Sequence, residues 1–262
     1  MTELPGGIVD GASRGFYFVE AGYADLLRRV GLADAQSVFD NPNIHAWRSI
    51  TERENCVLDH PGGRLHIKRN KPGQSGIESE IEGIRLLEKA GIGSVPVCGY
   101  GRLNDGRGFL ITDHLVGFDD CHKRLVAGEI TFDRLLEPTA ELAARLHSAR
   151  LHHRDLYLGH FFGDFSTDPP ALRLIDAGRV RTLPRLLARR WIIKDLAQFI
   201  FSTQGLPTVS DAQRTAWLDC YAAARGITLR FRALIDSKAR QIARHDAALR
   251  RKNPTRNVAL DR

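Results

Sequence analysis

The sequence predicts an α+β fold of two lobes, the first an antiparallel sheet with one helix and the second mainly helical. The chain has 262 residues, of which 43% are hydrophobic and 26% charged, as in ordinary globular proteins. Short apolar runs between turn-forming residues dominate as far as Thr112, and long helical periods follow from Asp113 onward. We therefore expect a sheet-rich lobe over residues 1–112 and a helical lobe over residues 113–262.

In the first lobe we expect a hairpin, one helix and two further strands. Residues 56–58 and 65–68 form short apolar runs on either side of a Pro-Gly-Gly turn, so Lys68 ends a predicted hairpin. A helix over residues 77–90 is indicated by apolar residues at helical spacing and a glycine stop: Ile77, Ile81, Ile84, Leu87 and Gly91. Strands are expected at 95–100 and 108–112. Residues 1–45 indicate only a short amphipathic segment.

Three helices are expected in the second lobe. Residues 132–149 and 191–203 each place apolar side chains on one face. Residues 230–252 form a basic amphipathic helix, which fits an anionic membrane surface but more commonly packs on its own protein with a charged exterior. The packing interpretation is the one we favour.

Composition and patterning exclude several classes of protein. No apolar stretch is long enough to span a membrane, and the first 30 residues lack a signal-peptide core, so we expect a cytoplasmic chain. The four cysteines lie far apart without a CxxC pair, which argues against a disulfide framework or a cysteine-rich zinc site. The net charge of +7 favours an anionic partner without identifying it.

The strongest local signal is the sequence His153-Arg154-Asp155, with His160 five residues after the aspartate and Asp176-Ala177-Gly178 further on. Protein kinases share this order and spacing. Phosphoryl transfer needs one carboxylate to orient the attacking hydroxyl and another to hold magnesium against the phosphates. Asp155 fits the first role, and Asp176 with His160 fits the second.

A kinase also needs a strand lysine that contacts the phosphates and a helix glutamate that holds this lysine. Lys68 is the strand lysine. Among the glutamates of the 77–90 helix, only Glu80 falls within the apolar stripe, where an unpaired carboxylate would be costly. We therefore expect Glu80 to pair with Lys68.

Two further residues receive roles from their positions. No glycine-rich loop precedes Lys68, so Arg53 is a candidate to contact phosphate in its place. Asp195 lies early in an apolar helix, where kinase-like folds often keep an aspartate that braces the catalytic loop, and an exposed helix-start carboxylate is the equally plausible alternative. His153 is also expected to be structural.

Each signal alone has an ordinary explanation, such as a turn for Asp-x-Gly, and the kinase interpretation rests on their conjunction. Three rivals stay open. His152, His153, Asp155 and His160 could bind a transition metal in a hydrolase, although Lys68 would then be unexplained. The chain could be a catalytically silent ATP-binding module, which the missing glycine loop permits. It could also be a protein kinase for another acceptor, although no Ala-Pro-Glu follows Asp176.

The stretch from His153 to Phe161 resembles the catalytic loop of the bacterial lipopolysaccharide core heptose kinases of the Kdo/WaaP family, which also place Tyr two residues after the motif and His where protein kinases have Asn. The resemblance extends from about Trp47 to Tyr221. Asp176-Ala177-Gly178 departs from the family's DLH-like sequence but keeps the aspartate.

The resemblance implies a two-lobed protein-kinase-like fold and an ATP-dependent kinase for a heptose or Kdo hydroxyl of the lipopolysaccharide inner core. The implied cofactors are ATP and Mg²⁺, with Mn²⁺ tolerated because imidazole is a softer ligand than an amide oxygen. An anionic core glycolipid at the cytoplasmic face of the inner membrane is the implied acceptor. We expect it to bind near Arg179, Arg181 and Arg185, and a solvated basic face is the alternative explanation of these arginines. Peripheral membrane contact is compatible with this location, and no nucleic acid partner is expected.

Overall fold

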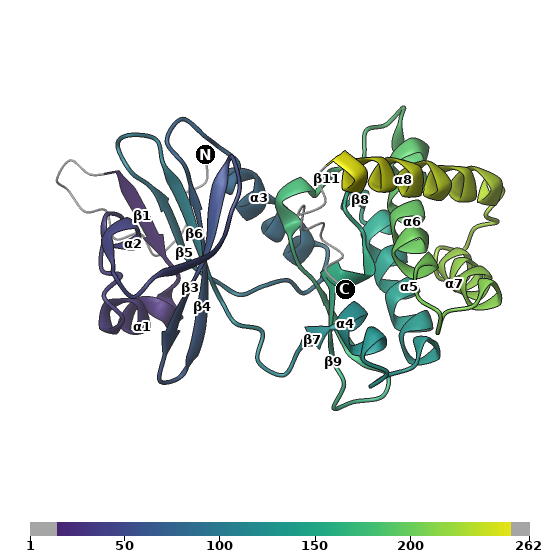
Figure 1. Ribbon diagram of the computed structural model, residues 1–262, viewed down its shortest axis with the longest axis horizontal. Coiled ribbons are helices and arrows are strands. Elements are labelled where there is room, and N and C mark those ends of the chain that lie inside the picture. Colours follow the sequence, from purple (N-terminus) through teal and green to yellow (C-terminus); the bar gives the residue numbers. More distant parts are fainter. Residues whose placement is uncertain (1–14, 253–262) are drawn as a thin grey trace. The chain divides into compact units, whose positions relative to one another are not determined.

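The computed structural model describes residues 15–252, which form two compact units (Figure 1). The first unit comprises the chain as far as Glu82 together with Val95–Val116, and the second comprises Gly83–Ser94 and the chain from Gly117 onward. The sequence predicts one continuous N-terminal lobe, whereas these contacts group residues 83–94 with the helical part. The first unit is sheet-rich and the second mainly helical, which confirms the predicted α+β class.

The first unit is built on one six-stranded antiparallel sheet with the strand order β1-β5-β6-β4-β3-β2. The predicted hairpin is present as β3 and β4, in which Asn55 is the register partner of Lys68. On its other side β4 pairs with β6, where Leu110 lies opposite Lys68. The strands are β1 (Phe16–Val19), β2 (His45–Ser49), β3 (Arg53–His60), β4 (Gly63–Asn70), β5 (Val97–Arg102) and β6 (Gly108–Asp113).

Short helices pack on this sheet and close its core. Leu27 and Val38 from these helices belong to the same buried cluster as Ile67 and Phe109 from the strands. The hydrophobic contact fixes the middle of the sheet, and with it the position of Lys68 on β4. The helical elements are η1 (Ala21–Tyr23), α1 (Ala24–Arg29) and α2 (Ser37–Asp40).

Helix α3 (Ile77–Lys89) follows the predicted apolar stripe closely. Ile77, Ile81, Ile84 and Leu87 are all buried, as is Glu80, while the other glutamates of the helix are exposed. The helix ends before Gly91, whose φ of 67° is a left-handed conformation that suits glycine. The stripe therefore places a carboxylate among apolar side chains.

The second unit contains most of the helices and two small sheets, one of three strands and one of two. Its helices are α4 (Cys121–Val126), α5 (Phe132–Ser148), α6 (Ala188–Gln204), α7 (Asp211–Ala224) and α8 (Arg232–Lys252), with the short turns η2 (Leu158–His160) and η3 (Ala177–Arg179). Its strands are β7 (Asp119–Asp120), β8 (Leu151–His152), β9 (Phe161–Asp164), β10 (Ala171–Leu174) and β11 (Arg181–Thr182).

Stacked aromatic rings form the core of the helical unit. Phe199 of α6 lies parallel to Trp217 of α7, with ring centroids 3.9 Å apart, and the indole nitrogen donates to Thr139 of α5 at 2.9 Å. Helix α8 packs against α6 and buries Ile235 and Ala239, in keeping with the packing interpretation of this basic segment. Between residues 15 and 252, no helix has the length and apolar character needed to cross a bilayer.

Candidate functional site

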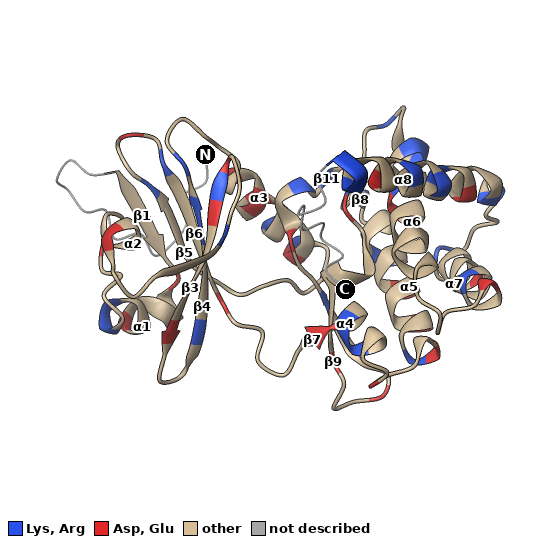
Figure 2. Ribbon diagram, viewed as in Figure 1, with Lys and Arg blue, Asp and Glu red and all other residues tan. Residues whose placement is uncertain are grey.

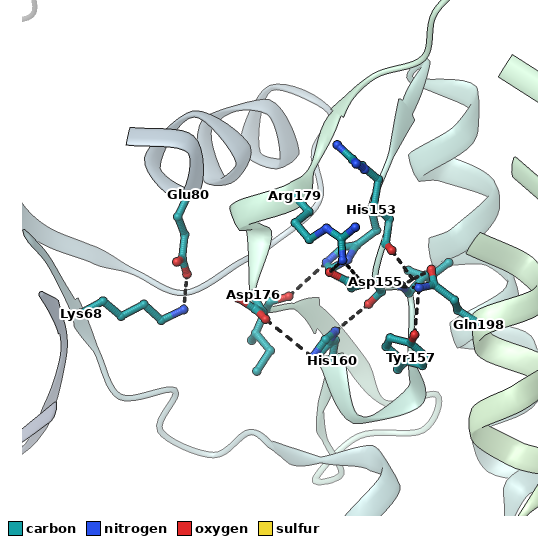
Figure 3. Close-up of polar contacts among 12 residues, drawn as sticks. Lys68, Glu80, His153, Asp155, Tyr157, His160, Asp176, Arg179 and Gln198 are labelled. Atoms are coloured by element: carbon teal, nitrogen blue, oxygen red, sulfur yellow. Dashed lines mark hydrogen bonds and ion pairs between the residues drawn. The ribbon is translucent and has the colours of Figure 1, made fainter. Parts of the chain in front are cut away.

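Lys68 and Glu80 form an ion pair within the first unit (Figure 3). Glu80 is only 2% exposed, and its second oxygen accepts a hydrogen bond from Arg53 Nη1 at 3.3 Å. Two cations therefore compensate a carboxylate that would be costly to bury alone. The pair fixes the end of the Lys68 side chain, which is the arrangement required of a lysine that binds phosphate.

Arg53 lies at the first residue of β3 and forms an ion pair with the Glu80 carboxylate. The sequence suggests a contact between Arg53 and phosphate, and that role stays a prediction. In the structure Arg53 is a second basic group beside the same carboxylate that binds Lys68. The Glu80 carboxylate therefore has a cation at each of its two oxygens.

In the second unit, Asp195 of α6 holds the backbone of the catalytic loop. Its carboxylate accepts hydrogen bonds from the backbone nitrogens of His153 at 2.7 Å and Arg154 at 2.8 Å, and His147 Nε2 lies 3.3 Å away. Asp195 is completely buried, unlike an exposed helix-start residue. Burial raises the pKa of Asp195, but the His147 contact and the backbone donors outweigh it, so the net pKa lies below its usual range. The carboxylate thus stays ionised and keeps the loop in place.

Two more side chains of α6 reach the same loop. Lys194 Nζ donates to the carbonyl of Arg154 at 2.6 Å, and Gln198 Nε2 donates to that carbonyl at 2.8 Å and to the Tyr157 hydroxyl at 3.0 Å. Gln198 Nε2 also lies 3.4 Å from Asp155 Oδ1. The sequence interpretation missed Lys194 and Gln198. Their signal is the polar spacing of residues 194, 195 and 198 on an otherwise apolar helix.

Asp155 carries an ion pair with Arg179. Both carboxylate oxygens lie 2.9 Å from Arg179 Nη1. The Arg179 side chain is 51% exposed and that of Asp155 17%, so the cation covers the carboxylate from the solvent side. The sequence predicts Arg179 near an acceptor, and in the structure Arg179 contacts Asp155, the expected catalytic carboxylate (Figure 3).

His160 and Asp176 face one another near this loop. His160 Nδ1 donates to the backbone carbonyl of Asp155 at 2.6 Å, and its Nε2 lies 3.9 Å from Asp176 Oδ2. When the imidazole is neutral and Nδ1 is the donor, Nε2 carries a lone pair that faces the Asp176 carboxylate. Two acceptors that face each other in this way fit a cation bound between them. Within residues 15–252, no group of three or more His, Cys, Asp or Glu is placed to hold a metal, so phosphate and water would have to supply the other ligands.

The Asp176 turn is held from two sides. Asp176 has a φ of 55°, a left-handed conformation that aspartate tolerates better than most residues. His153 is fully buried and its Nε2 donates to the Ile175 carbonyl at 3.1 Å, and burial lowers the pKa of His153. On the other side, a Cβ added at Gly83 of α3 would lie 1.9 Å from the Ala177 carbonyl oxygen. The turn therefore packs directly on the backbone of α3.

Arg181 and Arg185 follow Arg179 in the chain. Arg181 Nη1 donates to the Val180 carbonyl at 2.6 Å, and Arg185 is exposed. Arg154 adds another cation to the loop, and its guanidinium lies over the Trp191 ring, 4.8 Å from the ring centroid. Burial and the nearby charge of Arg179 lower the pKa of both Arg154 and Lys194. The surroundings of Asp155 are therefore strongly positive.

Comparison with known proteins gives a consistent result. The lipopolysaccharide kinase (Kdo/WaaP) family matches residues 37–221. The chain is similar to the lipopolysaccharide core heptose(I) kinase WaaP of Pseudomonas aeruginosa, with 29% identity over 144 residues that cover 48% of this chain and 52% of that protein. The match thus spans about half the length of the curated relative.

A solved structure supports the fold independently. The chain is similar to WaaP in complex with acyl carrier protein, with a TM-score of 0.68 and 21% identity, over 87% of this chain and 98% of that one. At this level of identity the likeness concerns the fold alone, and it confirms the kinase-like fold class expected from the sequence.

Proposed function

Because the chain belongs to the lipopolysaccharide kinase (Kdo/WaaP) family, we propose that it is an ATP-dependent kinase that phosphorylates a heptose or Kdo hydroxyl of the lipopolysaccharide inner core. Family membership supports a kinase, and therefore a phosphotransferase, and the nucleotide and the sugar hydroxyl are the proposed specifics. The observation that carries the proposal is the catalytic loop, where Asp195 holds the backbone on which Asp155 and His160 are presented.

In the proposed reaction, Asp155 accepts or orients the proton of the acceptor hydroxyl while the terminal phosphoryl group of ATP is transferred to the hydroxyl oxygen. Lys68, held by Glu80, contacts the phosphates of the nucleotide. Arg179 occupies both oxygens of Asp155 in the structure, so the acceptor must share or displace this cation before Asp155 can act. A phosphate or carboxylate on the acceptor would attract the guanidinium and so release Asp155.

Asp176 and His160 are the residues proposed to hold Mg²⁺. When bound, the metal would neutralise charge on the phosphates. The imidazole ligand leads us to expect relative tolerance of Mn²⁺. His160→Asn should therefore lower the activity with Mn²⁺ more than the activity with Mg²⁺. An unchanged ratio of the two activities would count against His160 as a ligand.

The charge around the loop supports an anionic acceptor. From residue 177 to residue 194 the sequence has six basic residues and no Asp or Glu. Arg179, Arg181 and Arg185 are the proposed acceptor-binding residues in this stretch. The core glycolipid, which carries carboxylates and phosphates, has the complementary charge.

A protein partner is a second element of the proposal. The solved relative is described as a complex with acyl carrier protein, and its fold matches this chain over 87% of the chain's length. We propose that this chain also binds acyl carrier protein, at the cytoplasmic side of the inner membrane. Co-elution of the two purified proteins in size-exclusion chromatography would support this, and their separate elution would argue against it.

The central test is transfer of labelled phosphate from ATP to dephosphorylated core glycolipid. We expect the purified chain to label a sugar hydroxyl, and Asp155→Asn to reduce turnover by about 10² or more, the magnitude typical of a positioned base. Unimpaired labelling by Asp155→Asn would reject the assigned role. Stoichiometric zinc without ATP binding would favour the hydrolase. ATP-induced thermal stabilisation without turnover would favour a catalytically silent module, and labelling of protein alone would favour a protein kinase.

A further inference from the structure

An exposed apolar loop lies between β11 and α6 in the second unit. The side chains of Leu186 and Leu187 are 97% and 52% exposed, and they are adjacent in the sequence. An exposed leucine does not gain the favourable free energy of moving its side chain out of water, and two neighbouring exposed leucines leave more of this free energy unused. Nothing between residues 15 and 252 covers Leu186. This pair is therefore a candidate contact surface.

The loop is held firmly at both ends. Strand β11 pairs with β8, and just after it the backbone nitrogen of Leu183 donates to the Arg150 carbonyl at 2.7 Å, while Arg150 Nη2 donates back to the Leu183 carbonyl at 3.1 Å. At the other end, the carbonyl of Leu187 accepts from the backbone nitrogen of Arg190 at 3.1 Å, in the first turn of α6. Residues 184–187, the last of which is itself an anchor, therefore present the leucine pair from a fixed base.

Positive charge surrounds the leucine pair. Arg185 precedes it, and Arg189 and Arg190 follow it, and all three are exposed. Figure 2 shows Lys and Arg at the beginning of α6 and along α8. The sequence from 177 to 194 has no acidic residue that could neutralise this group locally. Exposed leucines between arginines suit a surface that is anionic on the outside and apolar beneath, which describes a bilayer of acidic phospholipids.

We infer that the loop of residues 184–187 inserts Leu186 and Leu187 into the surface of an anionic phospholipid bilayer, with Arg185, Arg189 and Arg190 on the headgroups. This deepens the proposed function and rests on it for its purpose, because a lipid-linked acceptor lies in such a surface. Leu186 lies seven positions after Arg179, which contacts Asp155, so the chain from one to the other spans about 25 Å at most. Asp155 is thus close enough to the bilayer to meet a headgroup sugar.

Helix α8 is the competing membrane surface, and the chain offers a matched comparison. Leu234 of α8 is 48% exposed, close to the value for Leu187, and Arg240 and Arg244 of α8 are exposed. These residues have the same chemistry as the loop but a different position. Substitutions in α8 therefore control for a general loss of charge or apolar area.

The test is co-sedimentation of the full chain with vesicles, without ATP or acceptor. We expect binding to vesicles of phosphatidylcholine with one quarter phosphatidylglycerol and little binding to phosphatidylcholine alone. Leu186→Ser with Leu187→Ser should weaken binding about tenfold or more, and Arg185→Gln about fivefold. Leu234→Ser, and Arg240→Gln with Arg244→Gln, should bind like the wild type.

Several results would overturn the inference. Insertion of the loop is contradicted if the wild type does not bind the anionic vesicles, if the double leucine variant binds them as well as the wild type does, or if only the α8 variants lose binding. A dimeric wild type and a monomeric double leucine variant in light scattering would assign the loop to an interface between two copies. Circular dichroism and thermal melting check that each variant is folded. Vesicle binding without phosphate transfer would leave the inference standing and remove only the proposed function.

Discussion

Replacing Arg179 with glutamine removes the cation that lies 2.9 Å from both carboxylate oxygens of Asp155. Because the Arg179 side chain is about half exposed, the ion pair is expected to contribute no more than about 1 kcal/mol, which corresponds to a factor of about five. In Arg179→Gln, Asp155 should be available to activate water, and slow ATP hydrolysis without acceptor should rise by up to about fivefold.

The same substitution should weaken binding of the anionic acceptor, because a charge-assisted hydrogen bond is lost. About tenfold higher KM for the core glycolipid is expected, since such bonds contribute about 1.5–3 kcal/mol. The assay compares ATP hydrolysis and glycolipid phosphorylation for the wild type, Arg179→Gln and the surface control Arg240→Gln. Slower ATP hydrolysis by Arg179→Gln, with an unchanged KM for the core glycolipid, would refute the claim that Arg179 both covers Asp155 and binds the acceptor.

Three further substitutions test the supports of the site. Asp195→Asn should lower the free energy of unfolding by about 3 kcal/mol in urea titrations, because a buried anion that binds two backbone donors is replaced by a neutral amide; a change below 1 kcal/mol would contradict this. Gly83→Ala should cost about 1–3 kcal/mol and reduce turnover, despite the better helix propensity of alanine, because its Cβ would collide with the Ala177 carbonyl; full activity would show that the turn can move. Burial lowers the pKa of His152 to about 4 in the folded chain. The unfolded chain therefore binds a proton at this residue near pH 6.5, whereas the folded chain binds it only near pH 4. The free energy of unfolding should consequently fall by up to about 3 kcal/mol as the pH drops from 6.5 to 4. His152→Phe should lack this part of the pH dependence, and identical pH profiles of the two proteins would disprove the assignment.

Local periodicity was enough to predict much of the fold. The spacing of Ile77, Ile81, Ile84 and Leu87 identifies the buried face of α3 and distinguishes Glu80 from its exposed neighbours. The apolar runs and turn residues likewise identify the β3-β4 hairpin, although β4 continues two residues past Lys68 to Asn70. These features depend on residues close together in the chain, which is why a single sequence predicts them.

Elements that depend on distant partners were missed. Strand β1 (Phe16–Val19) is a short edge strand that is recognisable only through its pairing with β5. The short pair β8 and β11 likewise depends on contact between Leu151–His152 and Arg181–Thr182. This pairing brings the chain after Asp176 back along the catalytic loop, so the ion pair of Arg179 with Asp155 was not predictable.

The catalytic loop shows both sides of this limit. The family resemblance, which is most specific at residues 153–161, is confirmed by the family match over residues 37–221. The place of Asp195 early in an apolar helix also suggests a bracing role. Only its burial in the structure distinguishes that role from an exposed helix-start carboxylate. Gln198 escaped notice because an amide on an apolar helix has no chemical signature until its partners, Tyr157 and the Arg154 carbonyl, are known.

The claim on which the proposed function depends most is that Lys68 and Asp176 act on one nucleotide. Calorimetric titration of MgATP into the wild type, Lys68→Ala, Asp176→Asn and the double variant measures this directly. We predict one ATP per wild-type chain and about tenfold or more weaker binding in each single variant. The double variant should be weaker by less than the product of the two effects, because the proposed function requires both residues to act on the same phosphates. Unchanged ATP affinity in Asp176→Asn, or no ATP binding by the wild type, would contradict the claim.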